Sequence, residues 1–195
     1  MAEVAASRSI VDRMVRAARL DVSLYEEVEA DTTATNQALM VVVLVAVAAG
    51  IGQAIAASMA GPNSPGIIGP VISSVLGALF GWAVWSYVVF FVGTRFMGGT
   101  ATYGELLRTL GFAETPSILL ILSFIPVLGG LASLVALIWR IVAGFIATRQ
   151  ALDLDNTRTL VTILLGMLAL VIVVAIVGII VGTIFGAGVL VGRMF

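Results

Sequence analysis

Long apolar runs separated by short polar segments dominate this chain. Five stand out, at residues 36–60, 70–92, 112–125 and 131–148 and in a run that begins near residue 159. The last run has no charged residue from 159 to 191, and a bilayer is the environment that needs such a length. Apolar residues do not alternate at every second position, so the runs predict helices rather than a β-barrel. The chain is therefore predicted to be an all-α polytopic membrane protein with a bundle of five transmembrane helices.

The positions of the arginines predict how the spans are oriented. Eight of the ten arginines precede the first span or lie between spans two and three or spans four and five. The positive-inside rule then places the N-terminus in the cytoplasm and the C-terminus outside. The final run exceeds the roughly 30 Å thickness of the hydrocarbon core, so we expect it to tilt strongly or to break near residues 186–188.

Composition narrows the possible functions. Hydrophobic residues make up 61% and charged residues 11% of the chain, and the mean hydropathy is +1.17. Cysteine, histidine and lysine are absent, which removes thiolate ligands, histidine bases and lysine nucleophiles. We therefore expect no catalytic, cofactor or metal site and no enzymatic activity.

The net charge of −1 gives no sign of nucleic-acid binding. The use of arginine in place of lysine, together with abundant alanine, valine and glycine, is typical of a GC-rich prokaryote. We therefore expect the protein to lie in the cell (inner) membrane of a prokaryote.

Residues 1–34 are predicted to form a cytoplasmic amphipathic helical segment, followed by a membrane domain at 35–195. Ser23 and Glu26 fit a capping box and predict a second helix that begins at Ser23. The apolar face of the segment comprises Val11, Met14, Val15, Ala18, Val22 and Tyr25. Two interpretations stay open: a surface for lipid or a protein partner, or a lid packed on the spans. The candidate contact residues are Arg13, Arg16, Arg19, Glu26 and Glu27, with Glu105 and Arg108 from the later polar helix.

Two charged residues fall where hydrocarbon is expected. Glu114 and Arg140 lie at similar distances on either side of the turn at residues 126–130, so antiparallel neighbouring helices place them at a similar depth. An arginine in lipid is costly unless it is paired. We therefore expect an intramembrane pair, either a structural link between spans or a polar site for a ligand or relay. Pro116 is expected to free carbonyls near residues 112–113 that Arg140 could bind.

Small residues recur at every fourth position in two spans. This spacing allows close helix packing, either within the chain or between copies. The residues are Ser73, Gly77 and Gly81 in the second span and Gly178, Gly182 and Gly186 in the last. Trp82 and Trp85, near the centre of the second span, are expected to pack between helices.

One stretch resembles a known family. It contains Tyr103-Gly104-Glu105-Leu106-Leu107, then LGFAETP at residues 110–116, a turn with Pro126, and Trp139 in the fourth span. These elements resemble the Yip family of Rab-interacting five-span membrane proteins, over roughly residues 10–185. The resemblance marks Gly111, Pro116 and Pro126 as motif residues. It implies a fold with an amphipathic N-terminus and, through the eukaryotic members' link to Rab GTPases and vesicle traffic, an adaptor role.

Three functional hypotheses follow. The leading one is a non-enzymatic membrane scaffold or adaptor that presents residues 8–31 and 95–111 to a protein partner. The second is a small transporter or channel with Glu114 and Arg140 on its pathway, and the third is an accessory subunit of a larger membrane complex. The expected partners are the lipid bilayer, a protein in the membrane or at its cytoplasmic face, and a further copy of the chain.

Overall fold

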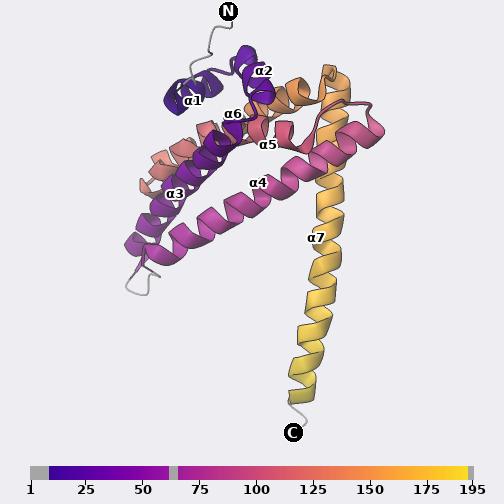
Figure 1. Cartoon of the computed structure of the whole chain (residues 1–195). Coiled ribbons are helices and arrows are strands. Elements are labelled where there is room, and N and C mark those ends of the chain that lie inside the picture. Colours follow the sequence, from indigo (N-terminus) through magenta and orange to yellow (C-terminus); the bar gives the residue numbers. More distant parts are fainter. Residues whose placement is uncertain (1–8, 62–65, 193–195) are drawn as a thin grey trace, which may run out of the picture.

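A computed structural model describes residues 9–61 and 66–192, without the side chains of residues 60, 178 and 180–192. The described chain is helical throughout, as the apolar runs predicted (Figure 1). Two short helices, α1 (Ile10–Ala18) and α2 (Val22–Ala30), precede the long α3 (Ala34–Ala60) and α4 (Ile68–Phe96). Then follow α5 (Tyr103–Ala113), the 3-10 helix η1 (Thr115–Phe124), α6 (Leu128–Leu152) and α7 (Asn156–Gly192).

Four of these helices, α3, α4, α6 and α7, are long and apolar enough to cross a membrane. The bent pair of α5 and η1, with an angle of 42°, becomes a fifth candidate when it is counted as one span. The five-helix prediction therefore corresponds to this upper count, with the third crossing broken. Pro116 stands in the first turn of η1, where its missing N–H ends the regular α-helical ladder.

The 3-10 helix η1 packs against both α3 and α6, while the two buried apolar clusters are formed by residues outside η1. At Gly52 of α3, an added Cβ would lie 2.5 Å from the carbonyl oxygen of Leu120 in η1. At Gly111 of α5, it would lie 2.8 Å from the Cβ of Ala38 in α3. No side chain fits at either position, so the two glycines bring α3 into backbone contact with the broken span. The motif glycine at position 111 thus has a packing role.

The last helix, α7, leaves the other helices. It packs beside α4 at its N-terminal end, where Gly166 lies against Val88 and Trp85, and then runs away from the bundle (Figure 1). Only 11% of its most apolar window is buried. The helix is continuous to Gly192, so of the two predicted alternatives, a strong tilt or a break near residues 186–188, the break is not observed. Glycines inside an apolar run do not interrupt a helix whose backbone is fully hydrogen-bonded.

Helices α1 and α2 pack on one end of the bundle, over α3, α5 and α6 (Figure 1). We call these two helices the lid and this end of the molecule the lid end. The observed contacts support the lid interpretation of the N-terminal segment, since residues of both helices enter the buried core.

Candidate functional site

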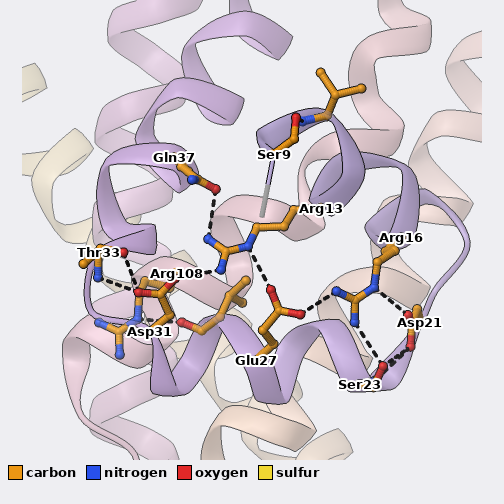
Figure 2. A network of polar contacts seen from close by, with 12 residues as sticks. Ser9, Arg13, Arg16, Asp21, Ser23, Glu27, Asp31, Thr33, Gln37 and Arg108 are labelled. Atoms are coloured by element: carbon orange, nitrogen blue, oxygen red, sulfur yellow. Dashed lines mark hydrogen bonds and ion pairs between the residues drawn. The ribbon is translucent and has the colours of Figure 1, made fainter. Parts of the chain in front are cut away.

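The lid is joined to the bundle through a buried arginine. Arg13 is only 3% exposed, and its guanidinium points into a ring of acceptors from α2, the following turn and α3 (Figure 2). Nε donates to Glu27 at 3.0 Å, Nη1 to Gln37 at 2.9 Å and Nη2 to Asp31 at 2.7 Å. A buried guanidinium with three acceptors is a strong, geometrically specific link. The prediction that Arg13 lies on an open contact surface is therefore wrong, because its charge is satisfied inside the protein.

Arg16 extends the same network along the lid (Figure 2). It pairs with Glu27 and with Asp21, whose oxygen lies 2.8 Å from Nε. The hydrogen bond from Arg16 lowers the pKa of Asp21 to about 2. Asp21 also accepts from the backbone N–H of Ser23 and thereby caps α2. The predicted helix start at Ser23 is thus wrong, because the cap is the aspartate two residues earlier.

Arg108 fixes the far end of α2. Its Nε donates to the backbone oxygen of Val28 at 2.8 Å, and its Nη2 donates to the backbone oxygen of Glu29. A cation there satisfies carbonyls that the end of a helix leaves unpaired. Arg108 is 6% exposed, so its prediction as a surface residue is also wrong. Glu105, one turn earlier, forms a capping box with Thr102 at the start of α5.

Tyr25 inserts from α2 into the bundle. It is fully buried against a core cluster that includes Val89, Leu106 and Leu152. Its hydroxyl has no hydrogen-bond partner among the described residues, and burial raises the pKa of the phenol. An unpaired buried hydroxyl costs free energy. Burial of the aromatic ring therefore stabilises the docked lid, whereas burial of the hydroxyl group destabilises it.

An acidic edge runs along the lid where α2 meets α5 and α6. Burial raises the pKa of Glu29 to about 7, and the nearby charges of Asp153, Glu105 and Glu26 act in the same direction, while Arg108 opposes them. Gln150 of α6 donates to Glu26 across this edge. The edge therefore holds a carboxyl group whose charge is poorly compensated at neutral pH.

The outward face of the lid carries both apolar and charged residues. Val11 is 64% and Val15 is 43% exposed, and Arg19 and Glu26 are also exposed. Of the predicted contact residues, Arg19 and Glu26 thus remain open to a partner, whereas Arg16 and Glu27 are engaged in the ion-pair network. The predicted apolar face is therefore right for Tyr25 but wrong for α1, where Arg13 and Ala17, rather than the valines, face the bundle.

The two intramembrane charges meet. Nε of Arg140 lies 3.3 Å from Oε1 of Glu114, at the junction of α5 and η1. The Arg140 side chain is 54% exposed and that of Glu114 is 23% exposed, so the pair lies at the edge of the bundle. The carbonyl of Phe112, expected to be freed by Pro116, accepts instead from the hydroxyl of Thr115.

Glycine packing differs between the predicted positions. An added Cβ at Gly77 or Gly81 would meet nothing within 4 Å. The interpretation that these two glycines allow close packing within the chain is therefore wrong. They face outward from α4. Gly178, Gly182 and Gly186 lie outside the residues whose side chains the structure describes. Trp82 packs as expected, and its indole N–H donates to the carbonyl of Leu107 at 3.0 Å.

Sequence reasoning missed the acceptors of the network. Asp21, Asp31 and Gln37 carry no motif, and their roles depend on where Arg13 and Arg16 point. A separate feature, the capping box at the start of α5, did have a signal in the sequence: Thr102 and Glu105 have the T-x-x-E spacing.

The fold and these sites define a polytopic helical membrane protein with a docked N-terminal lid. Among the groups of acidic, histidine and cysteine residues that the structure describes, none could hold a metal ion. The family model of the Yip1 domain matches residues 23–179. The chain therefore belongs to the Yip family, as its motifs indicated. No curated protein and no solved structure matches it.

Proposed function

We propose that this protein is a non-enzymatic membrane scaffold that presents its lid to a protein partner in the cytoplasm. The observation that carries the proposal is the buried attachment of the lid through Arg13 and Arg108. Two short helices that would be marginal in isolation are thereby held in one position. A pre-organised surface loses little conformational entropy when it binds a partner.

The exposed part of the lid suits such a role. Val11 and Val15 of α1 are exposed apolar residues, and the acidic edge around Glu29 belongs to α2, the other helix of the lid. A partner with an apolar centre and basic flanking residues matches both features. The arginine distribution supports a cytoplasmic position of the lid end.

Two cysteine labels test the orientation, since the natural chain has no cysteine. Ala30→Cys lies at the lid end, and Val127→Cys, 92% exposed, lies in the turn at the other end. In intact cells, an impermeant maleimide should label Val127→Cys only. If Ala30→Cys is labelled and Val127→Cys is not, the lid end lies outside the cell, and the proposal is rejected.

The partner surface is tested with the double variant Val11→Asp, Val15→Asp. Affinity purification from native membranes should lose the bound partner, while the melting temperature stays that of the natural chain because neither valine enters the network. Val127→Asp is the matched control, an exposed valine changed in the same way at the opposite end. A partner retained by the double variant would place recognition elsewhere.

A transporter or channel is the second candidate, and the Glu114–Arg140 pair is the observation that favours it. A pathway requires water access to the pair. A groove of about 390 Å³ between α3 and α4 is lined by Gln53, Ala57, Gly69, Pro70 and Ser73 and does not include either residue. A flux of solute into liposomes that contain the natural chain, and that disappears with Arg140→Leu, would favour a transport function over a scaffold function.

A further inference from the structure

Arg140 has more hydrogen-bonding capacity than its own chain uses. It is the only charged residue of α6 before Arg149, and its side chain is 54% exposed. Among the described residues, Glu114 alone lies within ion-pair distance. A guanidinium carries five N–H donors, and the contact with Glu114 is made by Nε, so the donors on the other two nitrogens are available to a further group. Leaving them in hydrocarbon costs free energy, which indicates that another group binds there.

The position along α6 argues against a lipid phosphate. Arg149, at the lid end of the helix, is nine residues away, or about 13 Å at 1.5 Å per residue. That exceeds the length of an arginine side chain, and Glu114 already holds this one in place.

Charge balance points to a second copy of this chain. The Arg140–Glu114 pair is neutral when both groups are ionised. A single additional carboxylate, or the phosphate of an anionic lipid, would leave a net negative charge in a medium that strongly disfavours it. A second copy brings one cation and one anion, so the combined cluster stays neutral and every guanidinium gains acceptors.

The face of α6 beside Arg140 has the spacing of a helix-packing seam. Its residues follow one another at intervals of three and four, the period of a coiled coil; they are Gly130, Ser133, Leu137, Arg140 and Gly144. An added Cβ at Gly130 or Gly144 would meet nothing within 4 Å, so both are open. Small residues let membrane helices approach closely. Leu137, in the middle, is 54% exposed.

We propose that two copies pack through this face of α6, each Arg140 donating to the Glu114 of the other copy as well as to its own. Both copies have the same orientation in the membrane, so their α6 helices run parallel and identical residues meet along the seam. The interface is independent of the proposed scaffold function, because it lies along the spans rather than on the lid.

Cysteine cross-linking of the purified full chain in phosphatidylcholine liposomes tests the interface. Leu137→Cys and Ser133→Cys lie on the seam, and Ile138→Cys is the matched control, because it is 55% exposed but faces another direction. The disulfide-linked fraction should be several-fold higher for the two seam variants than for the control, and should persist on dilution with lipid. Cross-linking through Gly77→Cys of α4 but not through the seam would overturn the proposal.

Mixing two charge variants tests whether Arg140 of one copy pairs with Glu114 of the other copy. Arg140→Leu and Glu114→Leu, each carrying Ser133→Cys, should cross-link poorly alone. Their mixture should regain mixed dimers, since one copy supplies the arginine and the other the glutamate. No gain on mixing would show that the pair acts only within one chain. Cross-linking that requires added phosphatidylglycerol would show that a lipid anion, and not the second copy, binds Arg140.

Discussion

Nε of Arg108 lies 2.8 Å from the backbone oxygen of Val28, 80 residues earlier in the chain. The arginine comes from α5, the first half of the broken span, and the oxygen belongs to the end of the lid helix α2. The hydrogen bond thereby connects the broken span directly to the lid. Arg108 at this end and Arg13, which donates to Gln37 of α3, at the other supply polar links between lid and bundle, beside the buried Tyr25.

Removing the Arg13 side chain should release the lid. In Arg13→Ala, the oxygens of Glu27, Asp31 and Gln37 lose hydrogen bonds from a charged donor, each worth about 1.5–3 kcal/mol. We expect faster amide hydrogen exchange throughout α1 and α2, with α3 and α4 unchanged. Arg19→Ala, an exposed arginine at the end of α1, is the control and should leave exchange as it is. Equal exchange in the two variants would mean that the other contacts of the lid, those of Arg108 and Tyr25 among them, hold it without Arg13.

Docking of the lid should weaken as pH rises. Burial and neighbouring carboxylates raise the pKa of Glu29 from 4.5 to about 7. The docked state therefore binds this proton more tightly than the released state, so its stabilising contribution is present below about pH 4.5 and is lost as pH rises through about 7. Hydrogen exchange of α2, corrected for its intrinsic pH dependence, should show this loss.

The variant Glu29→Gln should remove most of that pH dependence, because an amide stays uncharged. Its neighbours Glu26, Glu105, Asp153 and Arg108 are unchanged in the variant. Asp12→Asn alters an exposed carboxyl group on α1 and should keep the dependence of the natural chain. A pH profile unaffected by Glu29→Gln would assign the titration to another group.

Breaking the intramembrane pair should destabilise the bundle. Loss of one partner of a buried ion pair costs about 3–5 kcal/mol. We take that as an upper bound for Arg140→Leu, because the arginine is half exposed. Glu114→Leu should also destabilise, and the double Leu variant should recover much of the loss. Thermal unfolding in detergent measures all three. Arg158→Leu, which removes an exposed pair with Asp155, should cost about 1 kcal/mol or less.

Close packing of α3 on α5 should be sensitive to a single methyl group. In Gly111→Ala, the new Cβ would lie 2.8 Å from the Cβ of Ala38, and such overpacking typically costs about 1–3 kcal/mol. Gly77→Ala places a methyl group in open space on α4, where alanine's higher helix propensity should stabilise by up to about 1 kcal/mol. Opposite shifts of the melting temperature are therefore expected. A stable Gly111→Ala protein would show that α5 can move away from α3.

The sequence by itself determined the class of protein and the approximate limits of its spans. Hydrocarbon accepts only long apolar segments with internally paired backbones, so the runs at residues 36–60, 70–92 and 131–148 had to be helices. The pairing of Glu114 with Arg140 was also predicted, because the two residues stand at similar distances from one turn, although the structure has a 3-10 helix between Glu114 and that turn. The motif with Gly111 and Pro116 was sufficient to indicate the family.

Only the tertiary structure decided which charges are buried and which are free. Arg13 and Arg19 belong to one short helical segment, yet one meets three acceptors from other parts of the chain and the other faces outward. Likewise, Gly77 and Gly111 are both glycines of membrane-embedded segments, but only Gly111 is covered by another helix. Local patterns specify the faces of a helix, whereas burial and pKa depend on groups that distant segments bring together.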